Sequence, residues 1–167
     1  MLDPILIDTA TFTREQQYKF GEVSLRQLDE RVWSHELLAQ CDSMVSFKAT
    51  GGVDRWQRPF IDISVSAELQ LVCQHCLKPL SWFLDDHAHV VLFNNEQQLD
   101  EAMAADEAIE GILSATEINL TELIEDQILM ALPFAPCHDT CESVSTTRLN
   151  QDSDNPFAKL ATLKSGH

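Results

Sequence analysis

The clearest pattern along the chain is an alternation of apolar and polar residues from Phe60 to Leu71. Alternate positions place one set of apolar side chains on one face: Ile61, Ile63, Val65, Ala67, Leu69 and Leu71. The intervening positions are all polar: Asp62, Ser64, Ser66, Glu68 and Gln70. A period of two predicts a strand with one buried face and one wet face, as in an antiparallel sheet.

Segments on either side predict two further strands. Between Ser43 and Thr50 the apolar residues Val45, Phe47 and Ala49 share a face, and Gly51-Gly52 is expected to end this strand. Lys78-Pro79 predicts a turn, after which residues 81–93 should return beside the first strand. These segments together predict an antiparallel β-meander of three or more strands.

Helical spacing appears in three places. One or two short helices are expected between Thr11 and Cys41, where apolar residues recur at near-helical intervals, and one short helix within the acidic, mobile connection 94–117. A longer helix is predicted from Leu120 to Leu132, because Asn119 can cap it and Glu122 follows three residues later. Its apolar stripe consists of Leu120, Leu123, Ile124, Ile128 and Ala131, and Pro133 and Pro136 should end it.

The C-terminal part of the chain has a different character. Residues 143–155 are polar, with little to bury, and residues 155–163 predict a short amphipathic helix that begins with Asn155 and Pro156. That helix can either cover the core or dock into a partner's groove. The predicted fold is therefore α+β: a single domain over 1–142, in which the meander packs against helices, and a flexible tail over 143–167.

Length and composition indicate the number of domains and the expected cellular location. The 167 residues are enough for one substantial core, the first ten residues have no secretory features, and no segment approaches the roughly 20 apolar residues of a membrane span. A cytoplasmic protein is expected.

The net charge of −16 is concentrated in the middle of the chain, where residues 79–147 carry 14 Asp and Glu but no Lys or Arg. Such a field disfavours non-specific RNA binding and favours a basic partner, such as a ribosomal protein or an RNA-processing factor. The simpler interpretation is that acidity only keeps the protein soluble.

Five cysteines offer metal chemistry. Cys73 and Cys76 form a C-x2-C pair near the predicted turn, and Cys137 and Cys141 form a C-x3-C pair after the long helix, with His138 between them. Four thiolates are enough for a closed, structural zinc site, although the fold would have to bring the two pairs together. The alternative is that all are ordinary free thiols.

Other candidate residues give weaker signals. His87 and His89, with Asp85 and Asp86 beside them, are expected on the solvated face of their strand, and the acidic residues of the long helix, Glu122, Glu125 and Asp126, on its wet side. Trp56 lies between Arg55 and Arg58, so it can stack on a nucleotide or pack over the sheet edge, and packing is the expected role. No phosphate-binding glycine loop or nucleophile elbow is present, so catalysis is not predicted.

Several motifs in order resemble the YceD family, the large ribosomal RNA subunit accumulation proteins. They are Cys73-Gln74-His75-Cys76-Leu77-Lys78-Pro79, the helix 120–132, the segment Pro133 to Cys141 with Pro136 and His138, and Asn155-Pro156-Phe157-Ala158-x-Leu160. The resemblance implies a role in the synthesis, processing or stability of large-subunit ribosomal RNA, and no known enzyme activity. Cys73, Cys76, His138 and Cys141 match the family pattern and Cys137 does not, so the fourth ligand is either Cys137 or His138.

The sequence therefore predicts a non-catalytic accessory factor of ribosome biogenesis whose acidic surface, between Leu80 and Glu142, binds a basic protein. A metal-dependent RNA-processing hydrolase with an open zinc site at Cys73, Cys76 and Cys141 is one alternative. An RNA-binding module that uses Arg55, Trp56 and Arg58 is the other.

Overall fold

Five strands form the central sheet in the computed structural model, which describes residues 4–141. In spatial order they are β2 (Tyr18–Ser24), β3 (Met44–Val53), β4 (Pro59–Val72), β5 (Pro79–Phe93) and β6 (Glu110–Leu113). The first four are antiparallel neighbours, as the predicted meander requires, whereas β6 runs parallel to β5. The molecule is a single α+β domain, and α3 (Glu96–Ala105) makes the connection that a parallel pair needs.

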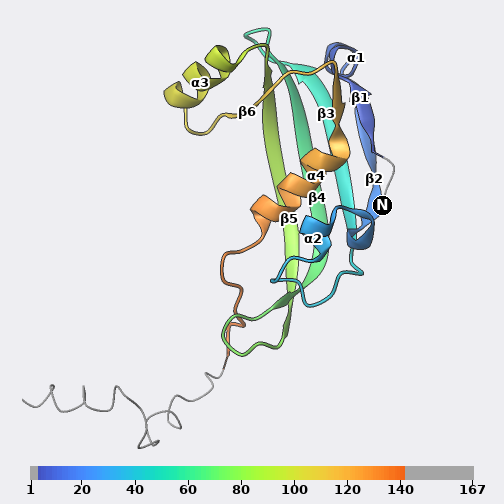
Figure 1. Ribbon diagram of the computed structural model, residues 1–167, viewed down its shortest axis with the longest axis vertical. Coiled ribbons are helices and arrows are strands. Elements are labelled where there is room, and N and C mark those ends of the chain that lie inside the picture. The colour runs from blue at the N-terminus through green and yellow to red at the C-terminus, as the bar shows by residue number, and fades with distance from the viewer. Residues whose placement is uncertain (1–3, 142–167) are drawn as a thin grey trace, which may run out of the picture.

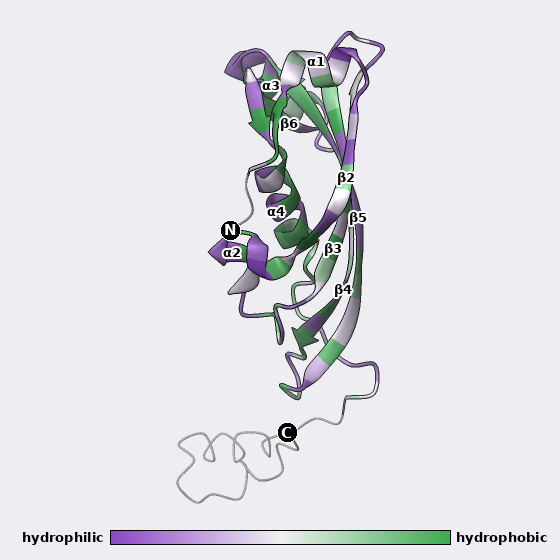
Figure 2. Ribbon diagram, turned by 90° about the vertical axis from the view of Figure 1, so that its right-hand side faces the viewer, coloured by the Kyte–Doolittle hydropathy of each residue, from purple (hydrophilic) through white to green (hydrophobic). Residues whose placement is uncertain are grey.

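The alternation in β4 has the predicted consequence. All six of its apolar residues from Ile61 to Leu71 are buried, with at most 5% of their surface exposed. Seen edge-on, the long strands curve, with α2 (Glu30–Trp33) and α4 (Leu120–Ala131) both on one side (Figure 2). The sheet therefore has one face covered by helices and one open face.

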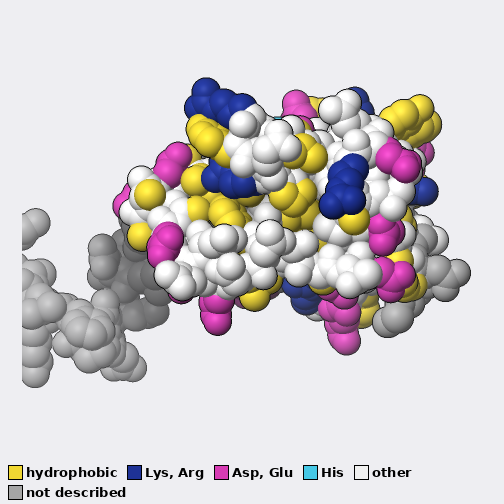
Figure 3. Space-filling view, turned by 90° about the horizontal axis from the view of Figure 1, so that it is seen from above, with side chains coloured by type: hydrophobic (Ala, Val, Ile, Leu, Met, Phe, Trp, Pro, Cys, Tyr) yellow, Lys and Arg dark blue, Asp and Glu magenta, His cyan; other side chains and the backbone are white. Residues whose placement is uncertain are grey.

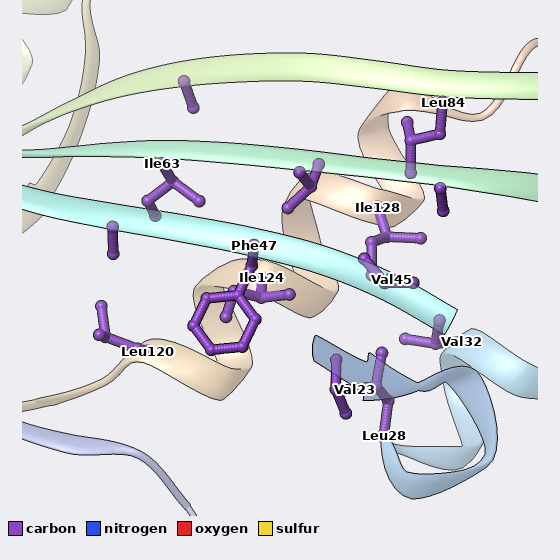
Figure 4. Close-up of a cluster of buried hydrophobic side chains, with 14 of the residues drawn as sticks. Val23, Leu28, Val32, Val45, Phe47, Ile63, Leu84, Leu120, Ile124 and Ile128 are labelled. Atoms are coloured by element: carbon purple, nitrogen blue, oxygen red, sulfur yellow. The ribbon is translucent and has the colours of Figure 1, made fainter. Parts of the chain in front are cut away.

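The main core lies between α4 and the sheet. Asn119 caps α4 by accepting a hydrogen bond from the Thr121 backbone N–H, as the sequence predicts. The apolar stripe of the helix then faces β3, β4 and β5, where Ile124 and Ile128 lie among Val45, Phe47, Ile63 and Leu84 (Figure 4). The end of β2 and the segment after it add Val23, Leu28 and Val32 to this core.

Shorter elements close the upper end of the sheet. Strand β1 (Leu6–Asp8) pairs antiparallel with β7 (Glu117–Asn119), and α1 (Thr9–Arg14) packs against β3. A 3-10 turn, η1 (Leu25–Gln27), follows β2.

None of the helices in the part of the chain described is long and apolar enough to cross a membrane.

One prediction about β3 was wrong, and one strand, β2, was not predicted. Gly51-Gly52 does not end β3, which continues to Val53, because these glycines let neighbouring groups approach closely: a Cβ at Gly51 would lie 2.8 Å from the carbonyl carbon of Phe12. The region 11–41 contains β2 as well as short helices. As an edge strand β2 buries only Val23, so it lacks the alternation that marked β4.

Two further predictions need correction or stay open. Glu125 is not on the wet side of α4: it is 5% exposed, and its carboxylate accepts hydrogen bonds from the Asp29 backbone N–H and from Arg31. In the region 94–117 the short helix is present as α3, but β6 and the start of β7 were not foreseen. The predicted tail and its helix at 155–163 lie outside the described residues.

Candidate metal centre

The lower end of the molecule holds the turn between β4 and β5, which contains the C-x2-C pair (Figure 1). The Leu77 backbone N–H donates to the Cys73 carbonyl at 2.9 Å, and the Cys73 N–H donates to the Lys78 carbonyl at 3.0 Å. Leu77 has a φ of 59°, in the left-handed region that L residues rarely adopt. The two hydrogen bonds close a tight knuckle with Cys73 and Cys76 on the same side.

The segment after α4 brings the second half of the cluster to this knuckle. Pro133 and Pro136 follow the helix and prevent its continuation, so the chain extends along the end of the sheet. The Gln74 backbone N–H donates to the Pro136 carbonyl at 2.8 Å and fixes the segment against the turn. This contact places His138 and Cys141 beside the C-x2-C pair.

Four side chains then converge: Cys73, Cys76, His138 and Cys141, called here the Cys/His cluster. One ligand atom from each lies within 4.8 Å of the others. The Sγ atoms of Cys73 and Cys141 are 3.7 Å apart, and Cys76 Sγ is 3.5 Å from His138 Nδ1. Tetrahedral zinc, with bonds of about 2.3 Å to sulfur and about 2.0 Å to nitrogen, would separate two sulfurs by about 3.8 Å and sulfur from nitrogen by about 3.5 Å. The cluster can therefore hold a metal ion.

The imidazole of His138 is oriented for this role. Its Nε2 lies 3.1 Å from the Pro79 carbonyl oxygen, which can only accept, so Nε2 carries the hydrogen and donates it. The lone pair of Nδ1 is then free to face the three sulfurs. Histidine ligands of metals commonly donate their second nitrogen to a carbonyl in this manner.

The thiols of the cluster affect one another's ionisation. Burial raises the pKa of the Cys73 thiol, but the backbone N–H groups of Cys76, His138 and His75 favour the thiolate and lower its pKa to about 5. Burial, together with the sulfurs of Cys76 and Cys73, raises the pKa of Cys141 to about 12. One thiolate is thus favoured and a second is opposed by the first. A bound dication removes that opposition, because it stabilises all the thiolates it ligates.

The remaining cysteines lie apart from the cluster. Cys137 is exposed, although it is next to His138 in sequence, and Cys41 is half-buried elsewhere. Sequence spacing left the choice between Cys137 and His138 open, and the structure places only His138 in the cluster. The Pro79 carbonyl that orients this imidazole had no signal in the sequence, since any residue supplies a carbonyl.

The histidines of β5 form a separate, open group. His87 and His89 lie on the exposed face of the sheet, as expected, and His89 Nδ1 is 2.6 Å from the Asp62 carboxylate of β4. Asp86 points to the other face, where its carboxylate accepts a hydrogen bond from Gln127 of α4. These residues do not converge into one site.

The carboxylates of the middle segment are concentrated in α3 and the loop after it. We call residues 96–110 the acidic lobe; its six exposed carboxylates are Glu96, Asp100, Glu101, Asp106, Glu107 and Glu110. Within the part of the chain that the structure describes, none of the six lies in an ion pair. The lobe projects from the upper end of the sheet, at the opposite end from the Cys/His cluster (Figure 1).

Comparison with known proteins places the chain near one family, through a family model and a relative with the same description. The family model described as large ribosomal RNA subunit accumulation protein YceD matches residues 61–164, a range that includes the whole Cys/His cluster. A protein of Haemophilus influenzae with the same description is 30% identical over 109 residues, which are 60% of this chain and 62% of the relative. The aligned region thus spans less than two thirds of that relative. No solved structure matches the chain.

Proposed function

Because the chain belongs to the YceD family of large ribosomal RNA subunit accumulation proteins, we propose that it is a non-catalytic accessory factor in ribosome biogenesis. In this proposal it supports the synthesis, processing or stability of large-subunit ribosomal RNA, and it works in the cytoplasm. Its mode of action is to bind a basic ribosomal protein or RNA-processing factor through its acidic surface.

The observation that carries the mode of action is the arrangement of the acidic lobe. Six carboxylates project into solvent within 15 residues, and no Lys or Arg occurs between positions 79 and 141. Carboxylates already paired inside a protein have little left for a partner, whereas exposed and unpaired ones steer a cationic surface toward them and set its orientation. The lobe therefore suits a basic protein better than the polyanionic backbone of RNA.

Tagged protein purified from cells, in two matched variants, tests this mode of action. The lobe variant carries Glu96→Gln, Asp100→Asn, Glu101→Gln and Glu107→Gln; the control variant removes the same four charges elsewhere, with Glu15→Gln, Glu36→Gln, Glu68→Gln and Asp85→Asn. All eight residues are exposed, so both folds should persist. We expect a basic protein that co-purifies with the control, is reduced with the lobe variant and dissociates at high salt. Equal recovery with both variants would refute the lobe as the binding surface.

We further propose that the Cys/His cluster holds one structural zinc ion. Three thiolates and one imidazole complete a tetrahedral set, which leaves no open position for a substrate or a reactive water. The ion would join the β4–β5 turn to the segment after α4. Metal analysis of protein purified without added zinc should find about one equivalent. Its absence, with folding unaffected by chelators, would refute the site.

The same ligand set distinguishes the accessory role from the hydrolase alternative. A catalytic zinc usually has three protein ligands and one exchangeable position, whereas here His138 supplies a fourth ligand atom. Purified zinc-loaded protein should therefore leave large-subunit RNA precursor intact. Specific cleavage that is lost in Cys76→Ser would replace the accessory role with the hydrolase.

A further inference from the structure

The loop between β3 and β4, residues 54–58, is held in one shape by the Asp54 carboxylate. This carboxylate accepts hydrogen bonds from the backbone N–H groups of Trp56 at 2.8 Å and Arg58 at 2.9 Å, and it pairs with the Arg58 side chain at 2.7 Å. The Asp54 N–H returns a hydrogen bond to the Arg58 carbonyl. Because the loop is already ordered, a ligand that binds it has little conformational entropy to remove.

This rigid loop presents an aromatic ring in contact with two cations. Trp56 is 60% exposed, with the Arg55 guanidinium 3.8 Å and the Arg58 guanidinium 4.7 Å from its ring centroid. Most of this side chain therefore stays accessible to a ligand, and the expected packing over the sheet edge involves only a minor part of it. Among the described residues no carboxylate lies within ion-pair distance of Arg55. Exposed tryptophan and arginine on an ordered loop are typical of binding surfaces.

An open groove of about 750 Å³ lies beside the loop. Its lining includes Trp56 and Arg58 of the loop, His87 and His89 of β5, and Asp106 and Glu110 of the acidic lobe. The molecule seen from above has Lys and Arg side chains beside hydrophobic ones at this end (Figure 3). The groove thus combines planar surfaces, cations and hydrogen-bond acceptors.

A nucleotide of single-stranded RNA satisfies each of these groups. Its phosphate can accept from the guanidinium groups, and its base can stack on the indole or on a guanidinium plane. Its exocyclic amino group or ribose 2′-hydroxyl can donate to the carboxylates. A nucleotide carries an anion for the arginines and hydrogen-bond donors for Asp106 and Glu110, whereas a uniformly acidic or uniformly basic peptide matches only one of these pairs. The combination of groups therefore favours RNA over either peptide.

We propose that the 54–58 loop and its groove bind single-stranded RNA over one or two nucleotides. The net charge of −16 limits this contact but does not abolish it, because at physiological ionic strength each exposed charge is screened beyond about 8 Å. Arg58 already pairs with Asp54, so two phosphates at most meet the two arginines, and the slope of log affinity against log salt should be no steeper than about −1.4. The contact shares Asp106 and Glu110 with the acidic lobe, but it depends on Arg55, Trp56 and Arg58, which the proposed binding of a basic protein does not use.

Titration of a short, fluorescently labelled single-stranded oligoadenylate with the full chain at low salt tests the proposal. We expect weak, saturable binding that falls about tenfold in Trp56→Ala, as loss of one stacked base predicts. Phe83→Ala removes an equally prominent aromatic, 66% exposed, from the distant end of β5 and should change affinity less than about twofold. Arg55→Gln should weaken binding and make its salt slope shallower.

Three results would overturn the proposal. They are the absence of saturable binding to the oligoadenylate, equal loss in Trp56→Ala and Phe83→Ala, and Trp56-dependent binding of a labelled polyglutamate peptide in place of RNA. None of these would affect the recovery of a basic protein by the acidic lobe, since the lobe variant alters no residue that lines the groove. The two proposals can therefore fail separately.

Discussion

The two ring nitrogens of His138 have different partners, and this division decides which residue completes the Cys/His cluster. Nε2 donates to the Pro79 carbonyl, and Nδ1 faces the sulfurs, 3.5 Å from Cys76. The exposed thiol of Cys137 has no such position. Of the two neighbouring candidate ligands, His138 therefore lies in the cluster and Cys137 lies outside it.

We predict that His138→Ala and Cys76→Ser each abolish stoichiometric zinc, whereas Cys137→Ser retains it. Loss of one ligand opens a four-ligand site, and structural zinc depends on the complete set. Metal analysis of the three purified variants measures this. If His138→Ala retained its zinc and Cys137→Ser lost it, the fourth ligand would be Cys137 and not His138.

Gly51 shows a different constraint at the scale of one residue. A Cβ there would lie 2.8 Å from the carbonyl carbon of Phe12, which belongs to the backbone and cannot rotate away. At Gly21 the nearest atoms are in the Phe47 ring, at 3.2 Å, and a side chain can adjust. We predict that Gly51→Ala lowers the free energy of unfolding by about 1–3 kcal/mol or more, as overpacking does.

Gly21→Ala serves as the control, with a smaller loss expected because the ring can move by a few tenths of an ångström. Urea denaturation of both variants compares them directly. An equal effect at the two positions would show that the α1 backbone yields as easily as a side chain.

Among the elements, burial decided which could be predicted from the sequence. β4 has a dry face and a wet face along its whole length, so its alternation predicted its bounds to within a residue or two. β2 is an edge strand with one buried residue, and β6 and β7 are four and three residues long. Such strands are defined by their partners and not by their own pattern.

The same limit applied to polar residues on α4. Helical spacing placed Glu125 with Glu122 and Asp126 because it considers only the helix itself. The structure adds the start of α2, where the Asp29 N–H and the Arg31 side chain surround the Glu125 carboxylate. Sequence patterns identified the residues of the Cys/His cluster because their types are rare, but not the fold that joins them.

We predict that Glu125→Ala lowers the free energy of unfolding by about 1.5–3 kcal/mol, because it leaves the Asp29 N–H without its partner and removes a hydrogen bond to a charge. Asp126→Ala removes the other, exposed carboxylate bound to Arg31 and should cost less than about 1 kcal/mol. Both are read from urea denaturation. Similar losses in the two variants would mean that Glu125 contributes only a surface ion pair.

In the whole molecule, the two ends carry different features. The lower end joins the β4–β5 turn to the chain after α4, while the upper end carries the acidic lobe and the 54–58 loop (Figure 1). The core between α4 and the sheet lies between them and does not include the cluster. Changes at one end should therefore leave the other intact.

Removal of the proposed zinc ion with a chelator tests this separation. We predict that backbone amides in 73–78 and 133–141 lose protection from hydrogen exchange, while those of β4 and α4 retain it, because the apolar core does not depend on the metal. Mass spectrometry of peptides before and after chelation measures the difference. Unchanged protection in 133–141 would show that the Gln74–Pro136 contact alone holds the segment, and global loss would show that the core needs the cluster.

The proposed function makes the acidic lobe necessary for the accumulation of large-subunit ribosomal RNA. Its most direct test is the ratio of large- to small-subunit ribosomal RNA in cells that lack the gene and carry the wild type, the lobe variant or the charge-matched control at equal abundance. The wild type and the control should restore the ratio, and the lobe variant should not. Full restoration by the lobe variant would contradict the account.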